Sequence, residues 1–318
     1  MNEEIFRTIV PLPKAPFCIV PAERVLCVGS CFADEMARRF QDDHFPTIAN
    51  PFGVMYNPAS ILHTIERLRS NFDQLQLKEA GRQQDVPFTT FEKADVALLT
   101  LGTNHVYIEK ATGEIVDNCQ KRPQQLFDEH CLGVDECADY LRRSIALLRE
   151  WNPEMKIVLT VSPIRYRKYG YHESQLSKAT LLMAVEKVKP TSNPSQREGD
   201  MNANYAAESK QAPLPWEGVG GGLFYFPSYE ILLDELRDYR FYATDMLHPS
   251  EQAVGYIYRR FQGCCFSDEA RLYVEEWRPI REALAHRPFN PDSPEYQAFK
   301  ENTRQQLDEF NQRWLSCL

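Results

Sequence analysis

The sequence predicts an α/β sandwich built on a short, mainly parallel sheet. Short, continuous apolar runs of the kind that form buried parallel strands recur along the chain. Each run is followed by a segment in which apolar residues return at helical spacing. With 318 residues, 43% of them hydrophobic and 25% charged, the chain is large enough to bury a substantial core. Alternating strands and helices place helices on both faces of such a sheet.

The elements follow in order along the chain. A strand over residues 24–29 leads into a helix over 33–40 and opens the fold. Further buried strands are predicted from their apolar runs at 94–101, 156–161 and 223–226. Further helices are predicted from apolar spacing at 59–69, 135–150, 175–188, 229–237 and 250–261. Ligands of such sheets bind beyond the carboxyl ends of the strands, so functional residues are expected just after each strand.

The chain divides into one main domain and a helical extension. Residues 1–266 form the predicted α/β domain, interrupted at 190–222 by a stretch rich in Pro, Ser, Asn, Gln and Gly without sustained periodicity. We interpret this stretch as a surface insertion that is partly mobile. Residues 267–318 are predicted to form amphipathic helices packed on the domain, separated by three prolines within 288–294. These helices are the expected surface for a homo-oligomer.

Composition excludes several classes of partner. The formal net charge is -9, so the chain lacks the excess of positive charge that drives binding to nucleic acid, and no nucleic-acid partner is expected. No apolar run approaches the ~18–20 residues that span a bilayer, so no membrane partner is expected. The N-terminus is acidic and is followed by prolines where an export signal would be apolar. We therefore expect a cytoplasmic protein.

Cysteine and histidine usage argues against disulfides and metals. Nine cysteines are an odd number and include no C-x-x-C pair, which fits neither a disulfide framework nor a zinc site. Most are expected to be reduced and to fill space in the core. The histidines outside the segment around His248 show no ligand spacing, so no metal is predicted.

Five segments follow predicted strands or lie where the sheet would place a site. They are GSCFA at 29–33, NPFG at 50–53, LGTN at 101–104, VSPIR at 161–165 and TDMLHP at 244–249. In the first, Ser30 and Cys31 lie between a strand and a helix, where free N–H groups lower a thiol pKa and favour negative charge. In the last, Asp245 precedes His248 by three residues, close enough to orient it as a general base.

Each of these features also has a plain structural interpretation. Cys31 alone is more often a buried filler, and Asp245 alone a helix cap ahead of a helix near residue 250. Gly53 is equally suited to a turn, and Asn104 to a loop that hydrogen-bonds its own backbone. Catalysis is favoured because the five segments occur together.

The segments VLCVGSCFADEMARRF, NPFG, LGTN and TDMLHPS resemble the GSCFA family, which is named after residues 29–33 and grouped with the SGNH, or GDSL-like, hydrolases. The resemblance covers residues 20 to about 262 apart from the insertion. It implies a three-layer α/β/α fold and an acyl-transfer site. In that superfamily the nucleophile follows strand one, a glycine N–H and an Asn side chain complete the oxyanion hole, and an Asp-x-x-His pair supplies acid and base.

The resemblance assigns roles residue by residue. Gly53 and Asn104 match the oxyanion-hole residues, and Asp245 and His248 match the acid–base pair. Ser30 falls on the superfamily's aspartate and Cys31 on its nucleophilic serine. Cys31 is therefore the predicted nucleophile, with Ser30 as the alternative. A thiolate nucleophile gives a thioester intermediate, which is suited to acyl exchange as well as to hydrolysis.

The predicted function is that of an acyl esterase acting on an O-acylated carbohydrate or a small ester, a substrate class that comes from the superfamily. One alternative is an acyltransferase that moves an acyl group from acyl-CoA to a hydroxyl, and another is a non-catalytic binding module. No cofactor is expected, and a CoA thioester is the co-substrate of the transferase alternative only. Substrate contacts are expected from Arg165, His105 and His172, although the basic and aromatic run at 165–172 also suits a solvated loop.

Overall fold

A five-stranded parallel sheet forms the centre of the molecule. The computed structural model describes residues 7–70, 94–117, 119, 122–189 and 222–315. The strands lie in the order β2-β1-β3-β7-β8, and every neighbouring pair is parallel. Their bounds are β1 (Val25–Gly29), β2 (Thr47–Ala49), β3 (Val96–Leu101), β7 (Lys156–Val161) and β8 (Leu223–Tyr225). The predicted parallel sheet is confirmed.

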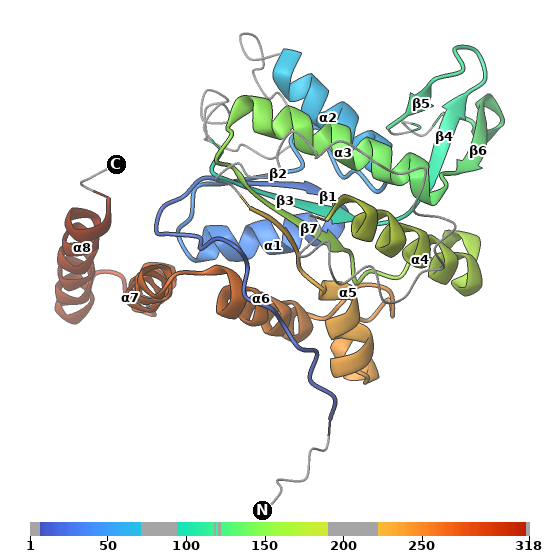
Figure 1. Cartoon of the computed structure of the whole chain (residues 1–318). Coiled ribbons are helices and arrows are strands. Elements are labelled where there is room, and N and C mark those ends of the chain that lie inside the picture. The colour runs from blue at the N-terminus through green and yellow to red at the C-terminus, as the bar shows by residue number, and fades with distance from the viewer. Residues whose placement is uncertain (1–6, 71–93, 118, 120–121, 190–221, 316–318) are drawn as a thin grey trace, which may run out of the picture.

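Helices cover both faces of this sheet (Figure 1). Along β1, Val25 and Cys27 pack in one hydrophobic cluster, whereas Leu26 and Val28 pack in the other, as the two-residue period of a strand requires. The first cluster holds residues of α1 (Cys31–Asp42), of the π-helical turn Ile231–Glu235, of α6 (Glu251–Cys265) and of α7 (Asp268–Ala285). Tyr229 of the short α5 (Ser228–Glu230) belongs to the second cluster. The second holds α2 (Pro58–Ser70), α3 (Val134–Trp151) and α4 (Tyr171–Val188). The sequence prediction of a three-layer α/β/α sandwich is confirmed.

Two predicted helices differ from the structure. The segment predicted as a helix over 229–237 forms only the short α5, followed by a π-helical turn over Ile231–Glu235. Helix α4 begins at Tyr171, earlier than the predicted residue 175. The prediction missed this first turn because its first three residues are exposed and show no apolar period. Strand β2 was not predicted, since three residues are too few to show a pattern.

A second, antiparallel sheet was also absent from the sequence prediction. It consists of β4 (His105–Glu109), β5 (Ile115–Val116) and β6 (Phe127–Cys131) in the order β5-β4-β6. Four of the five β6 residues are exposed, so the strand does not form the apolar run on which the prediction relied. The pairing sets His105 opposite Cys131 and Val106 opposite His130. Because successive residues of a strand point to opposite faces, these two pairs lie on opposite faces of the second sheet.

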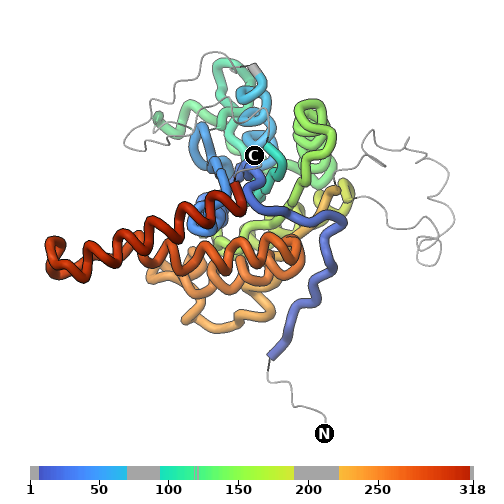
Figure 2. The backbone as a smooth tube through the Cα atoms, turned by 90° about the vertical axis from the view of Figure 1, so that its left-hand side faces the viewer, coloured from blue at the N-terminus to red at the C-terminus, as the bar shows by residue number. Residues whose placement is uncertain are grey.

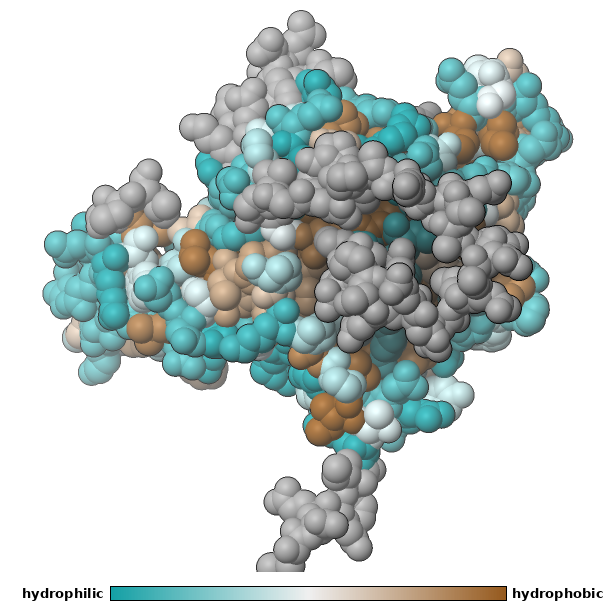
Figure 3. Space-filling view, in the orientation of Figure 1, coloured by the Kyte–Doolittle hydropathy of each residue, from teal (hydrophilic) through white to brown (hydrophobic). Residues whose placement is uncertain are grey.

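The C-terminal helices pack against the end of α1. On α7, the Tyr273 hydroxyl donates to the His44 carbonyl at 2.8 Å and the Trp277 indole to the Asp42 carbonyl at 2.9 Å. Helix α8 (Pro294–Trp314) stacks on α7 through Phe310, whose ring centroid lies 5.2 Å from that of Trp277. Figure 2 shows α8 extending past the rest of the molecule, and Figure 3 shows its largely hydrophilic outer surface. The boundary at residue 266 stays a prediction.

Two further predictions concern the insertion at 190–222 and the absence of a membrane-spanning segment. Apart from Gly222, the predicted insertion at 190–222 lies outside the described residues. None of the helices among the described residues combines the length and hydrophobicity needed to cross a bilayer. The cytoplasmic location stays a prediction.

The turn that joins β1 to α1 depends on a glycine. Gly29 has φ +137°, and a Cβ at this position would lie 2.1 Å from the Thr100 carbonyl oxygen on the neighbouring strand. The next residue, Ser30, donates its N–H to that same oxygen at 3.0 Å. The strand-to-helix turn is therefore held directly against β3, with no room for a side chain at residue 29.

We predict that Gly29→Ala destabilises the protein by about 2–4 kcal/mol, since it combines backbone strain with overpacking. Gly263→Ala is the matched control, because Gly263 lies inside α6 and no atom of the described residues lies within 4 Å of an added Cβ. That change should raise the free energy of unfolding by about 0.5–1 kcal/mol. Urea unfolding measures both, and equal effects of the two changes would contradict the role given to Gly29.

Candidate functional site

The turn after β1 treats its two candidate nucleophiles differently. Ser30 is the N-cap of α1: its Oγ accepts from the Phe32 N–H at 3.3 Å and lies 3.0 Å from Thr100 Oγ1. It is 1% exposed. Cys31 is the first residue of α1, is only partly buried, and its Sγ lies 3.5 Å from the Tyr56 hydroxyl. The Ser30 hydroxyl is thus used to cap α1 and to contact Thr100, whereas the Cys31 thiol contacts the Tyr56 side chain.

Asn50, in the NPFG segment, clamps this turn. Its Oδ1 accepts from the Gly29 N–H at 2.8 Å, and its Nδ2 donates to Asp34 Oδ1 at 2.9 Å. Gly53, the predicted oxyanion-hole glycine, donates its N–H to the Asn50 carbonyl at 2.8 Å. The Gly53 N–H is therefore engaged in the 50–53 turn. The sequence analysis singled out the segment but did not assign a role to Asn50.

The LGTN segment follows β3 at the same edge. The N–H groups of Gly102 and Thr103 both donate to the Tyr56 carbonyl at 2.8 Å. The Asn104 Nδ2 donates one N–H to the Leu132 carbonyl at 2.7 Å, which directs this amide toward the end of β6 and leaves its second N–H for another acceptor. The Asn104 Oδ1 is buried and has no hydrogen-bond partner among the described residues.

Asp245 and His248 form a carboxylate–imidazole pair. Asp245 Oδ2 lies 2.5 Å from His248 Nδ1, and Asp245 Oδ1 accepts from the N–H groups of Leu247 and His248 at 2.9 and 3.0 Å. The two backbone donors, and then the imidazole, lower the pKa of Asp245 to about 2. The His248 ring is 44% exposed. A carboxylate that stays ionised orients Nδ1 and leaves Nε2 as the acceptor, the arrangement of a general base.

The segment that carries this pair docks on the same edge as Cys31. The Leu247 carbonyl accepts from the N–H of Arg165, four residues after the end of β7, at 3.0 Å. Glu251, three residues after His248, is ion-paired at 2.5 Å with Arg38 of α1. Among the described residues, no hydrogen bond joins His248 to Cys31 or Ser30. The structure brings the two halves of the predicted site to one edge without direct bonding.

Aromatic rings form a wall beside Cys31. The Tyr56 ring centroid lies 5.6 Å from that of Tyr166, Tyr166 lies 5.5 Å from Tyr169, and Tyr169 stacks on His105 at 3.8 Å. Here His105 is held by Glu129, whose Oε1 lies 3.0 Å from Nδ1. The predicted contact residue His105 therefore supports the wall from the second sheet.

The two other predicted contact residues have different surroundings. The Arg165 guanidinium lies over the rings of Tyr242 and Tyr171, at 4.5 and 5.9 Å from their centroids. His172 lies exposed in the first turn of α4. Arg165 therefore borders the segment that contains His248, and His172 remains on the surface near the start of α4.

Sequence analysis missed a buried lysine behind the site. Lys178 on α4 is 2% exposed, and its Nζ donates to the carbonyls of Gly102 and Ser162 at 2.7 and 2.8 Å. Burial lowers its pKa to about 7. The neighbouring Ser177 Oγ accepts from the Asn104 N–H at 2.9 Å. Helix α4 thus braces the residues after β3 and β7. The spacing of Ser174, Ser177, Lys178 and Leu181 could have revealed this lysine on the buried face.

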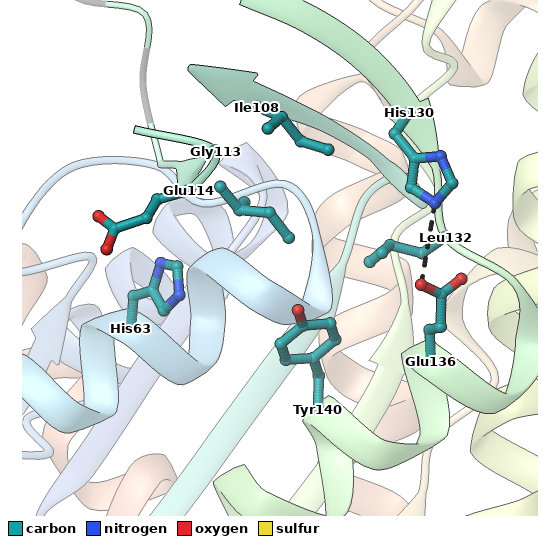
Figure 4. Close-up of a pocket in the computed structure, with 9 residues that line it drawn as sticks. His63, Ile108, Gly113, Glu114, His130, Leu132, Glu136 and Tyr140 are labelled. Atoms are coloured by element: carbon teal, nitrogen blue, oxygen red, sulfur yellow. Dashed lines mark ion pairs between the residues drawn. The ribbon is translucent and has the colours of Figure 1, made fainter. Parts of the chain in front are cut away.

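A separate cavity of about 630 Å³ lies between the second sheet and helices α2 and α3. Figure 4 shows the Tyr140 ring extending from α3 toward Ile108 and Leu132, with His63 on one side and the His130–Glu136 pair on the other. None of the predicted site residues lines it. Across the described residues no group of three or more side chains is arranged to hold a metal ion.

The fold and the edge described above are those of an α/β protein with a short parallel sheet. The chain belongs to the GSCFA family, whose model matches residues 24–86, 74–205 and 214–261. A second model, the C-terminal domain of GSCFA domain proteins, matches residues 277–317. The family prediction is confirmed. No curated protein matches the chain at a significant level.

Solved structures with a similar arrangement share little sequence with the chain. A putative GDSL-like lipase from Parabacteroides merdae matches with a TM-score of 0.41 and 10% identity over 79% of this chain and 98% of that chain. A family 3 carbohydrate esterase from Clostridium thermocellum gives a TM-score of 0.35 and 12% identity over 83% and 99%. The salicylyl-acyltransferase SsfX3 gives 0.37 and 13% over 78% and 54%.

We predict that Lys178→Met changes the pH dependence of stability. The unfolded amine keeps its proton up to about pH 10.4, whereas the folded amine loses it near pH 7. Unfolding therefore takes up a proton between these values, so this group makes the wild type more stable as pH rises, by up to about 1.4 kcal/mol per pH unit. Urea unfolding of both proteins at about pH 7 and pH 9 measures the difference.

Lys187→Met on the same helix is the control, since Lys187 is exposed and paired with Asp135. Comparing variants with the wild type cancels the titration of all other groups. A difference between wild type and Lys178→Met that stays constant across this range would contradict the account.

Proposed function

We propose that the protein is an acyl-transfer enzyme, an esterase that uses Cys31 as nucleophile and His248, oriented by Asp245, as general base. The observation that supports the proposal is the presence of two groups in segments at the carboxyl edge of one parallel sheet: a carboxylate-bound, 44% exposed imidazole and a partly exposed thiol at a helix N-terminus. Such edges bind ligands where the strand order reverses, here between β1 and β3.

Cys31 is favoured over Ser30 for a physical reason. Ser30 Oγ already caps α1 and contacts Thr100, and its residue is 1% exposed. Attack by Ser30 would require the loss of that cap, which typically costs about 1 kcal/mol, and an opening of the turn toward the substrate. The Cys31 side chain needs neither change.

The proposed reaction has two steps. The Cys31 thiol gives its proton to His248 Nε2, and the sulfur attacks the acyl carbonyl carbon to form a tetrahedral oxyanion. The carbon–oxygen bond to the leaving group then breaks, and the departing oxygen takes the proton from the imidazolium. In the second step His248 removes a proton from water, and the resulting attack on the thioester releases the acid and restores the thiol. An ionised Asp245 stabilises the imidazolium in both steps.

The proposed substrate is an O-acylated carbohydrate or a small ester. The aromatic wall formed by Tyr56, Tyr166 and Tyr169 supports this class, because sugar rings pack on aromatic faces. The wall begins at the residue that contacts the Cys31 sulfur, so a sugar held against it would present its ester at the thiol.

A second candidate function is acyl transfer from acyl-CoA to a hydroxyl acceptor. It is favoured by the cations of the run that follows β7, where Arg165, Arg167 and Lys168 occur within four residues. Guanidinium groups bind phosphates in a bidentate manner, and CoA carries several. The thioester intermediate proposed for Cys31 can be discharged by a hydroxyl as readily as by water.

We predict that Cys31→Ala and His248→Ala each lower kcat/KM for p-nitrophenyl acetate by at least about 10³-fold, since nucleophile and base act as a unit. Cys18→Ala, which removes an exposed cysteine outside the candidate site, should keep wild-type activity. Spectrophotometric assays give the rates, and thermal unfolding checks that each variant is folded. Wild-type turnover by Cys31→Ala would refute the assignment of the nucleophile and favour Ser30, whereas a wild type without turnover would favour a binding module.

The two candidate functions predict different responses to CoA. For an esterase, CoA should leave the melting temperature unchanged and water alone should release acetate from the enzyme. For a transferase, CoA at millimolar concentration should raise the melting temperature, and Arg165→Ala should abolish the shift. Differential scanning fluorimetry with and without CoA measures this. A shift that survives Arg165→Ala would contradict the role of the basic run.

A further inference from the structure

We infer that Tyr56 is a catalytic residue whose hydroxyl donates a hydrogen bond to the oxyanion formed when Cys31 attacks an acyl carbonyl. This inference rests on the proposed function and adds a residue to its site. Tyr56 follows the NPFG segment in a loop ahead of α2, and the sequence analysis gave it no role. Three observations support the inference. Tyr56 lies beside Cys31, its hydroxyl keeps its proton, and the Gly53 N–H and the Asn104 amide, the donors predicted from the sequence, already have other hydrogen-bond partners.

The hydroxyl of Tyr56 lies within hydrogen-bond distance of the proposed nucleophile, the Cys31 sulfur. The distance from Tyr56 Oη to Cys31 Sγ is 3.5 Å. When the sulfur attacks a carbonyl carbon, the oxygen bonded to that carbon becomes the oxyanion. This oxygen then lies close enough to the sulfur to accept a hydrogen bond from the Tyr56 hydroxyl. The Cys31 N–H, at the first position of α1, has no hydrogen-bond partner among the described residues and forms the second donor.

Main-chain hydrogen bonds hold Tyr56 in place between the GSCFA turn and the LGTN segment. The Tyr56 carbonyl accepts from both the Gly102 and the Thr103 N–H groups, and the preceding Met55 donates its N–H to the Gly29 carbonyl at 2.8 Å. A Cβ on Gly102 would lie 2.9 Å from the Tyr56 carbonyl oxygen and 3.3 Å from its ring. Glycine at 102 is what allows the tyrosine to approach so closely. Tyr56 is therefore held between the GSCFA turn and the LGTN segment.

Tyr56 is suited to donate and not to ionise. Burial, the hydrogen bond with Cys31 and the repulsion between a phenolate and an ionised Cys31 all raise the pKa of this phenol well above its ordinary value. The hydroxyl thus keeps its proton throughout the reaction. In the tetrahedral step the sulfur–carbon bond forms, the carbonyl π electrons move to oxygen, and Tyr56 stabilises the charge without transferring a proton.

The expected donors leave room for this role. The Gly53 N–H is used by the Asn50 carbonyl, and the Asn104 amide is 6% exposed and bonded to the Leu132 carbonyl. Neither group contacts Cys31 in a described hydrogen bond, whereas Tyr56 does. An oxyanion at Cys31 therefore meets the tyrosine hydroxyl first.

Tyr56→Phe tests the inference, because it keeps the ring and the main-chain bonds and removes only the hydroxyl. We expect kcat for p-nitrophenyl acetate to fall by about 10²–10³-fold with KM changed by less than about threefold, the signature of an interaction made in the transition state. Alkylation of Cys31 by iodoacetamide, which forms no oxyanion, should change by less than about threefold. Tyr140→Phe, at the separate cavity, should keep wild-type kcat.

Gly102→Ala provides a second test. It should displace Tyr56 and lower kcat, and adding it to Tyr56→Phe should cause little further loss, since both changes remove one interaction. A kcat of Tyr56→Phe within about threefold of wild type, a parallel fall in alkylation, or fully additive losses would each overturn the inference. A wild type without acyl turnover would instead overturn the proposed function, and the inference with it.

Discussion

The close approach of the turn after β1 to the end of β3 is the constraint on which the candidate site depends. Gly29 packs against the Thr100 carbonyl with no space for a Cβ, and the Ser30 N–H bonds to that carbonyl at 3.0 Å. One residue beyond β3, Gly102 lies close to Tyr56, since a Cβ there would be 2.9 Å from the Tyr56 carbonyl oxygen. These two contacts set the first turn of α1, and so Cys31, beside the LGTN segment where the strand order reverses. Any chemistry at this edge relies on that geometry.

Charge is handled in two different ways around this edge. Behind the site, Lys178 is buried with carbonyl partners, and no carboxylate is among its hydrogen-bond acceptors within the described residues; burial accordingly lowers its pKa to about 7. In front of it, Asp245 is exposed and held ionised by two backbone N–H groups and an imidazole. The buried amine stiffens the loops after β3 and β7, while the exposed pair presents a ring nitrogen. Support and proposed reactivity are thus assigned to separate groups.

The sequence was sufficient for the parts of the fold with strong local patterns. Buried strands such as Val96–Leu101 are continuous apolar runs, and α3 has an unbroken helical period, so both were predicted within two residues. The exposed strand Phe127–Cys131 has no such run, and the second sheet was missed. The order of the strands and the contacts between loops arise only when the sheet forms, and no local pattern encodes them.

The candidate site shows the same division. The motifs indicated loops that the structure places at one edge of the sheet, and they indicated the contact of Asp245 with His248, because three residues suffice for that contact. The positions of Tyr56 and Lys178 depend on long-range packing, since one comes from the loop before α2 and the other from the buried face of α4. The direction of the Asn104 amide likewise depends on Leu132, which belongs to an unpredicted part of the fold. A residue type in a motif gives its chemistry, but its partners come from the tertiary structure.

The central claim is that the Cys31 sulfur, and not the Ser30 hydroxyl, takes up the acyl group. Rapid acid quenching of the wild-type protein during turnover of p-nitrophenyl acetate, followed by peptide mass spectrometry, tests it most directly. The account predicts an acetyl group on Cys31 that neutral hydroxylamine removes, as it removes thioesters. An acetyl group on Ser30, or one spread over the exposed cysteines without preference for Cys31, would contradict it.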